Sequence, residues 1–179
     1  MLRDLPDELS TPRLRLRRPE LADASGIFWA YAQDAAVCRF MIWQPHAVES
    51  ITRAFIQSCI DAWDQGDRLA YVITERGAGL AIGMLEARVQ GTTVDMGYVL
   101  ARAHWGKGFM PEAIQALTTA ALGSAGIYRV QATCDTENVQ SQSALEKAGF
   151  VREGRHERLT IHPNVSAEPR ACFMYAKCR

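Results

Sequence analysis

The sequence predicts an α/β domain built on a mixed sheet, and two observations support that prediction. Three strand-like segments, 69–74, 80–89 and 94–100, follow one another with short turns between them, as antiparallel hairpins do. After residue 100, helix and strand alternate, which requires a helical crossover and a parallel strand pair. A doubly wound sheet would need regular alternation throughout, and the three consecutive strands disfavour it.

Each element in the first part of the predicted order, β-α-α-β-β-β-α-β-α-β-β, has its own signal. Segment 13–17 alternates Arg and Leu with a period of two, as an opening strand does. Two helices follow, the first at 20–33 after Pro19 and the second ending at Gly66. The spacing of apolar residues predicts that the second helix buries Ile51, Ala54, Phe55, Cys59 and Ala62.

The second part of the chain supplies the crossover. A helix begins directly after the Gly-Lys-Gly sequence at 106–108. Segment 127–134 is strand-like, and 138–148 is a helix followed by Gly149, which suits a left-handed C-cap. Two further strands are expected from Phe150 onward. The apolar stripe of the helix after the glycines consists of Met110, Ala113, Ile114, Leu117 and Ala121.

Composition limits the classes of function. A chain of 179 residues with 48% hydrophobic and 22% charged residues suits one globular domain, residues 1–179. A formal net charge of +0 offers no bulk field for nucleic acid or an anionic membrane, so we expect neither as a partner. The N-terminus has no apolar signal region, and no apolar run is long enough to span a bilayer. The five cysteines lack metal-ligand spacing, so we expect reduced thiols, no metal and a cytoplasmic location.

The turn between strand 94–100 and the next helix is the most informative segment. Its Gly-Lys-Gly sequence, 106–108, lets the backbone adopt positive φ and approach a ligand closely. The first N–H groups of a helix are unpaired and carry partial positive charge, so the turn predicts an anion site suited to a pyrophosphate. Neither a Walker loop nor the dinucleotide fingerprint is present. A glycine turn without a ligand is the alternative.

A second informative segment opens helix 138–148. Asn138 is a favourable helix N-cap, and Ser141 follows it in the first turn. Helix capping alone would explain both residue types.

Together the two segments resemble a known family. GYVLARAHWGKGFMPEA (97–113) and ENVQSQSALEKAGF (137–150) are similar to two motifs of the RimJ/RimL-like branch of the GNAT acetyltransferases, in the same order and at about the same separation. In the wider superfamily the first motif is Q/R-x-x-G-x-G/A. Trp105 and Met110 depart from it here, and both departures resemble a variant that is common in this branch. The resemblance extends from TPRLRLR near the start to FMYA near the end. It implies the GNAT acyl-CoA N-acyltransferase fold over the single domain.

The resemblance also implies an activity and a set of residues. The activity is acetyl transfer from acetyl-CoA to a primary amine by direct attack in a ternary complex. Residues 105–110 would wrap the pyrophosphate, the main chain of 99–101 would pair with the pantetheine arm, Asn138 would contact that arm, and Ser141 would protonate the leaving thiolate. Many relatives use a Tyr where Leu145 stands here, which leaves Ser141 as the acid. The expected cofactor-binding residues are Val99, Leu100, Ala101, Trp105, Gly106, Lys107, Gly108, Phe109, Met110, Asn138 and Ser141.

The general base remains open among several carboxylates. Asp95 lies three residues before Tyr98, near where many relatives place a carboxylate, and Glu86 on the preceding strand is the second candidate. His156 and Glu157 could face the same cleft. For each of them a solvated strand position is the alternative. An amine of low pKa that reacts through a water chain would need no base.

Two further expectations concern the reaction. A bulge in strand 94–100 would offer backbone N–H groups to the thioester carbonyl. Cys134, at the end of a strand near the site, is a candidate nucleophile for a ping-pong reaction, although no His/Asp grouping stands out to activate it.

The acceptor is expected between the first helices and the last hairpin. Segment 39–46 is apolar and aromatic, which suits a hydrophobic wall, and segment 162–170 is polar and contains prolines, as a mobile rim does. We expect the partner to be a small amine or a protein N-terminus and the chain to be a monomer or homodimer. The alternatives are a non-catalytic CoA-binding sensor or partner module and a binder of another phosphate ligand at the glycine turn.

Overall fold

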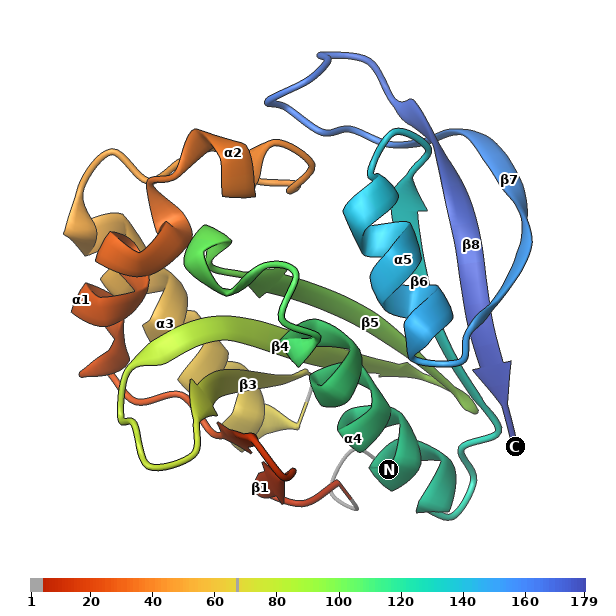
Figure 1. The fold of residues 1–179 in the computed structure, drawn as a ribbon, viewed down its shortest axis with the longest axis horizontal. Helices are drawn as coiled ribbons and strands as arrows, with labels where there is room; N and C mark the ends of the chain where they lie inside the picture. The colour runs from red at the N-terminus through yellow and green to blue at the C-terminus, as the bar shows by residue number, and fades with distance from the viewer. Residues whose placement is uncertain (1–4, 67) are drawn as a thin grey trace.

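The computed structural model describes residues 5–66 and 68–179. Within them, one sheet of eight strands has the order β1-β2-β3-β4-β5-β6-β8-β7, and β5 with β6 is its parallel pair (Figure 1). This is the mixed α/β architecture that the sequence predicts. The strands are β1 (Glu8–Ser10), β2 (Leu14–Arg17), β3 (Leu69–Glu75), β4 (Ala81–Gln90), β5 (Thr93–Leu100), β6 (Arg129–Asp135), β7 (Val151–Thr160) and β8 (Arg170–Cys178).

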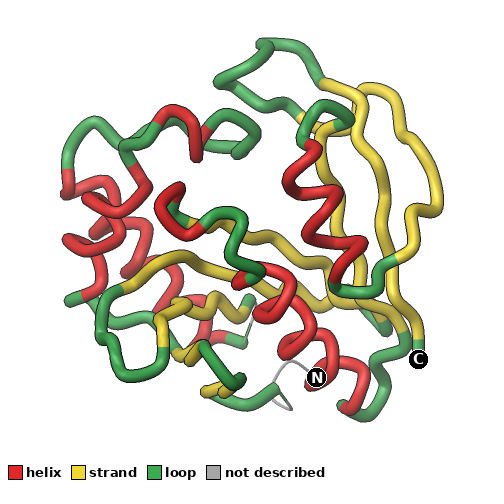
Figure 2. The backbone as a smooth tube through the Cα atoms, in the orientation of Figure 1, coloured by secondary structure: helices red, strands yellow, loops and turns green. Residues whose placement is uncertain are grey.

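Helices cover both faces of this sheet (Figure 2). One face packs against α1, the π-helical turn η2 and α3, and the other against α4 and α5. β1, the short helix α2 and the 3-10 turn η3 lie where the sequence predicted no element. No helix in the described ranges has the length and apolarity to cross a membrane. The helices are α1 (Asp23–Ile27), η2 (Phe28–Ala32), α2 (Ala35–Cys38), α3 (Glu49–Gln65), η3 (Arg102–His104), α4 (Phe109–Gly123) and α5 (Val139–Lys147).

The face that α3 buries differs from the predicted one. Ile51 is 44% exposed and Ala54 is exposed as well. The helix is rotated because Trp63 near its C-terminal end docks on β3, where its indole N–H donates to the Ala70 carbonyl at 2.7 Å. The buried stripe is therefore Thr52, Ile56, Cys59 and Trp63, still at spacings of three and four.

The sheet divides between β5 and β6. Their parallel pairing ends at Asp95 with Gln131, although β5 continues to Leu100 and β6 to Asp135. Figure 1 shows β6 and β8 running away from β4 and β5 beyond this point, with α5 beside the gap. The part of β5 beyond Asp95 is consequently an open edge of the sheet.

The bulge expected in strand 94–100 is absent. The pairing of β4 with β5 runs without a shift from Gly83 opposite Leu100 to Gln90 opposite Thr93. The opening arises because β6 leaves β5, so no extra residue in β5 is needed to produce it.

Candidate active site

Two cavities meet at the C-terminal end of β5. The loop cavity, of about 620 Å³, lies among the 104–111 segment, the start of α4 and α5. The aromatic cavity, of about 580 Å³, extends from there beneath segment 40–46 to β3 and β4. The lining residues that the two cavities share are Phe40, Met41, Tyr98, Val99, Asn138 and Ser141.

The loop cavity has the properties of an anion site. Gly106 and Gly108 have φ angles of 74° and 77°, the left-handed region that favours glycine. Within the described chain, the N–H groups of 106–110 donate to no backbone carbonyl, so they are available to a ligand at the start of α4. Phe109 and Met110 are each 6% exposed with their side chains in the core, which leaves their N–H groups as the parts that can face a ligand.

Lys107 plays a different part from its neighbours in the turn. Its side chain is exposed and does not line the loop cavity, whereas its carbonyl accepts a hydrogen bond from Nη1 of Arg13 at 2.9 Å. The turn is therefore fixed from outside through its main chain.

An anchor from residues 11–13, directly before β2, holds the turn and the start of α4 together. Glu112, in the first turn of α4, accepts from the Thr11 hydroxyl at 2.5 Å, the Arg13 N–H at 3.0 Å and the Arg13 Nε at 2.6 Å. The Arg13 guanidinium also lies 4.7 Å from the centre of the Phe109 ring. Burial raises the pKa of the Glu112 carboxyl, but these hydrogen bonds outweigh burial and hold its pKa below the ordinary value. We call Thr11, Arg13 and Glu112 the loop anchor.

Along the open edge of β5, the main-chain N–H and C=O groups of every second residue face the opening. The Ala101 N–H donates to the Ile82 carbonyl at 2.8 Å, so the main chain of Ala101 faces β4. Because antiparallel pairing alternates, the N–H and C=O groups of Tyr98 and Leu100 face the opening instead. The Leu100 carbonyl is already taken by the indole N–H of Trp105 at 2.7 Å.

This geometry corrects the expectation for Ala101. Its carbonyl also accepts from the His104 N–H at 2.9 Å, so neither main-chain group is free to pair with a cofactor arm. Val99 likewise directs its main chain to β4, opposite Met84, while it lines both cavities. Tyr98 and Leu100 are the residues whose main chain can act as the edge.

A pair of hydroxyl groups stands at the junction of the cavities. The Tyr98 hydroxyl and Ser141 Oγ share a hydrogen bond of 2.7 Å. Asn138 caps α5 by accepting from the Ser141 N–H at 3.2 Å, which orients Ser141 toward β5. Burial raises the pKa of Tyr98, against the opposite effect of the hydrogen bond with Ser141, so the phenol stays protonated.

Tyr98 is the residue that the sequence reasoning missed. Its signal is the alternation in β5, which places Val94, Met96 and Tyr98 on one face of the sheet. That face is the one covered by α4 and α5, so Tyr98 meets Ser141 across the junction.

The two expected bases are both held by arginine. Asp95 lines neither cavity and accepts from Nη2 of Arg88 at 2.5 Å. Glu86 does line the aromatic cavity, but one of its oxygens pairs with Arg88 and the other with Arg68 at 3.2 Å. In this structure Asp95 therefore lies away from the junction, and each oxygen of Glu86 already accepts from an arginine.

Cys134 lies in the lining of the aromatic cavity. Burial raises the pKa of its thiol to about 11, and the residue is 5% exposed. A protonated thiol is a poor nucleophile, so the geometry disfavours an acyl-cysteine at this position.

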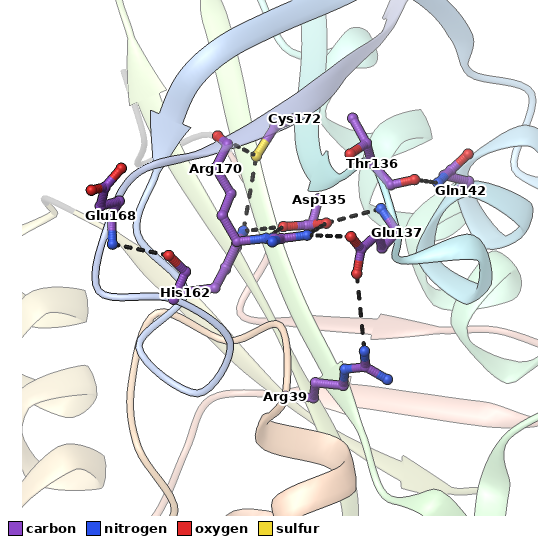
Figure 3. Close-up of polar contacts among 10 residues, drawn as sticks. Arg39, Asp135, Thr136, Glu137, Gln142, His162, Glu168, Arg170 and Cys172 are labelled. Carbon is purple, nitrogen blue, oxygen red and sulfur yellow. Dashed lines mark hydrogen bonds and ion pairs between the residues drawn. The ribbon is translucent and has the colours of Figure 1, made fainter.

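Beside the two cavities, the buried Asp135 is the centre of a cluster of charged side chains (Figure 3). Asp135 is fully buried and accepts from Nε of Arg170 at 2.6 Å and from the Glu137 N–H at 2.9 Å. Arg170 also pairs with Glu137 at 2.9 Å, and His162 lies 3.7 Å from Asp135. Burial raises the pKa of Asp135, but the hydrogen bonds from Arg170 and Glu137 dominate and lower it. Asp135 therefore stays ionised and fixes the end of β6 to β8.

The rim between β7 and β8, which its sequence predicts to be mobile, is hydrogen-bonded to segment 38–43. The side-chain amide of Asn164 donates to the carbonyls of Cys38 and Trp43 at 2.7 Å and 2.8 Å. On β7, His156 and Glu157 are exposed and line neither cavity, so the structure does not bring them to the junction.

Comparison with known proteins agrees with this geometry. Residues 13–151 match the family described as acetyltransferase (GNAT) domain. The uncharacterized N-acetyltransferase p20 of Bacillus licheniformis is 32% identical over 151 residues, which cover 83% of this chain and 84% of that protein. RimL, a ribosomal L7/L12 alpha-N-protein acetyltransferase solved with coenzyme A, superposes with a TM-score of 0.84 at 20% identity over 96% of this chain and 97% of its own. The microcin C7 self-immunity acetyltransferase MccE, solved with acetyl-CoA and AMP, has a TM-score of 0.84 at 22% identity over 94% of each chain.

Proposed function

This chain belongs to the GNAT family of N-acetyltransferases, and we propose that it moves an acetyl group from acetyl-CoA to a primary amine held in the aromatic cavity. The observation that supports this most strongly is the meeting of the two cavities at the Tyr98–Ser141 pair. RimL and MccE, which share the fold, were solved with coenzyme A and acetyl-CoA. We also propose that residues 1–179 act as a single domain.

In this proposal acetyl-CoA occupies the loop cavity. The free N–H groups of 106–110 bind the pyrophosphate, and the start of α4 adds its partial positive charge. The main chain of Tyr98 and the N–H of Leu100 pair with the pantetheine arm along the open edge of β5. Asn138 lines the same cavity and contacts the arm. The thioester then lies at the junction, beside Ser141.

The reaction is a direct transfer in a ternary complex. The nitrogen of the neutral amine attacks the thioester carbonyl carbon, a C–N bond forms, and the C–S bond breaks. Ser141 donates its hydroxyl proton to the departing sulfur and recovers one from the Tyr98 hydroxyl through their 2.7 Å hydrogen bond. The amine nitrogen releases its surplus proton to water, which restores the pair, so the products are an acetylated amine and a free thiol.

No carboxylate is assigned as the general base. Glu86, one of the two expected bases, lines the aromatic cavity, yet both of its oxygens accept from arginine side chains. The charged groups in the lining of the aromatic cavity are paired within the protein, so an ammonium that leaves water there gains no free counter-ion, and the acceptor loses its proton as it enters. Water at the mouth of the cavity then accepts that proton.

The test is turnover with a broad amine panel. Purified protein is mixed with acetyl-CoA and each amine, and the free thiol is followed by absorbance while the acetylated amine is identified by mass. We expect one acetylated amine for each thiol released. Binding of CoA without turnover of any amine would contradict the proposal and would favour a non-catalytic CoA-binding module. Failure of CoA to bind, with binding of another phosphate ligand, would contradict the assignment of the loop cavity.

A further inference from the structure

The geometry of the aromatic cavity points to its occupant, and we infer that the acceptor is a small primary amine attached to an uncharged aromatic body. This inference rests on the proposed function, because it concerns the acceptor of the same reaction. If the acceptor is of this kind, polyamines and lysine-rich peptides are expected to be poor acceptors. Three features support it: the rings in the wall, the pairing of the charges and the bridge that joins the walls.

Aromatic rings pack against one another, tilted or edge to face, in the wall that segment 40–46 and α3 form. The ring centres of Trp43 and His46 are 5.1 Å apart, and those of His46 and Phe55 are 6.5 Å apart. Phe40, also in the lining, meets His162 edge to face at 6.3 Å. Burial lowers the pKa of His46, so its ring is neutral near pH 7. A flat apolar body packs well against rings arranged in this way.

The charges in the lining are already paired within the protein. In the described ranges, Arg68 and Arg88 hold the two oxygens of Glu86, and Asp135 accepts from Arg170 at 2.6 Å. A second ammonium group on the acceptor would lose its water and find no free carboxylate. An anionic group would similarly find no free guanidinium. The cavity is therefore suited to a body without charge.

Two walls of the cavity, segment 40–46 and the β7–β8 rim, are joined by hydrogen bonds. Asn164 lies in the β7–β8 rim and donates to the carbonyls of Cys38 and Trp43. These two hydrogen bonds hold both ends of segment 38–43. A volume of about 580 Å³ is typical of pockets for small ligands. A bridged cavity of this size favours a compact acceptor over one that continues as an extended peptide.

The first experiment compares acceptors on the intact protein. The specificity constant kcat/KM is measured with saturating acetyl-CoA for phenethylamine, spermidine and a peptide with an N-terminal alanine. We expect phenethylamine to exceed each of the others by about tenfold or more, because it alone places an uncharged ring in the cavity. A higher value for spermidine or for the peptide would overturn the inference and leave the proposed function intact.

The second experiment changes the wall. Trp43→Ala is expected to lower kcat/KM for phenethylamine by about tenfold, mainly through KM, with CoA affinity unchanged. Trp29→Ala is the matched control, because Trp29 is 69% exposed and lines neither cavity. Phe55→Asp adds an unpaired carboxylate to the wall and should shift the preference from phenethylamine toward spermidine. Equal behaviour of the two tryptophan variants, with no shift in the Asp variant, would contradict the inference.

Calorimetric titration separates this inference from the proposed function. The same amines are titrated onto the CoA complex, so that acceptor preference is measured without turnover. Tighter binding of phenethylamine than of spermidine supports the inference even if no amine is acetylated, an outcome that would count against the proposed function alone. Preferential binding of spermidine would overturn the inference whatever the turnover.

Discussion

Removing one side chain of the loop anchor is expected to weaken acetyl-CoA binding without unfolding the protein. The change is Arg13→Ala, at the residue directly before β2. Thr11 still donates to Glu112 at 2.5 Å after this change, and so does the main-chain N–H of residue 13 at 3.0 Å. The start of α4 therefore stays attached, while the Gly-Lys-Gly turn loses its support from outside.

The magnitude follows from three contacts of the Arg13 guanidinium. Its hydrogen bond to the Lys107 carbonyl, at 2.9 Å, contributes about 1 kcal/mol at a half-exposed site. Its ion pair with Glu112 contributes about 0.5 kcal/mol, since the arginine side chain is 48% exposed and screened by solvent. Its position 4.7 Å from the centre of the Phe109 ring contributes about 0.5 kcal/mol.

About half of this total of roughly 2 kcal/mol should appear in cofactor binding, because the turn must be ordered before its N–H groups can meet the pyrophosphate. A loss of about 1 kcal/mol raises the KM for acetyl-CoA by about fivefold. The value of kcat should change little, because the junction at Tyr98 and Ser141 is untouched.

The assay is steady-state thiol release at varied acetyl-CoA, supported by calorimetric titration of CoA. Arg15→Ala is the matched control: Arg15 lies two residues further along, in β2, and pairs with Glu8 at 2.7 Å instead of with the turn. An unchanged KM in Arg13→Ala, or an equal change in Arg15→Ala, would refute the role of the loop anchor.

Three further outcomes are expected. Tyr98→Phe and Ser141→Ala should each lower kcat by about a hundredfold with little change in the KM for acetyl-CoA, and a change confined to KM would argue against proton donation. Gly83→Ala should lower the free energy of unfolding by about 1–3 kcal/mol in a denaturant titration, because a Cβ there would lie 2.5 Å from the Val99 carbonyl oxygen. Glu112→Gln should lower the unfolding midpoint at neutral pH; the folded-state pKa of Glu112 lies below its ordinary value of 4.5, so the difference from the wild type should shrink as the pH falls below 4.5. A difference that stays constant with pH would contradict the hydrogen bonding of that carboxylate.

The glycine turn and its helix were predictable because their signals are local. Gly106 and Gly108 fill positions with positive φ, and the apolar stripe of α4 follows from its spacing alone. The N-cap at Asn138 is equally local, since its side chain accepts from an N–H three residues on. Such features depend on a few consecutive residues, which the sequence displays directly.

The face of α3 was harder to predict because its apolar residues are spread around the helix. Ile51 and Ala54 fit one stripe, and Ile56 and Trp63 fit another. The choice is made by the contact of Trp63 with the Ala70 carbonyl on β3, which a helical pattern alone does not reveal. Tertiary contact therefore overrides the local spacing.

The chemistry of the site depends on pairs distant in the chain. Tyr98 and Ser141 are 43 residues apart and meet only because β5 and α5 flank the same opening. The pairing of Glu86 with Arg68 similarly joins β4 to the residue before β3. Because of this pairing, the candidate base Glu86 is a carboxylate bound to arginine. A residue type and its strand position indicate that a carboxylate is present, but its partners decide what it can do.

The most direct test of the assignment is a crystal structure of the protein with CoA and an unreactive analogue of the acceptor. We predict that the pyrophosphate meets the N–H groups of 106–110 and that the thiol lies within about 3.5 Å of the Ser141 or Tyr98 hydroxyl, or one water away. The analogue should then occupy the aromatic cavity with its reacting atom facing the thiol. A CoA molecule bound away from the loop cavity would contradict the proposed reaction. So would a thiol that lies farther from both hydroxyl groups than one bridging water can span.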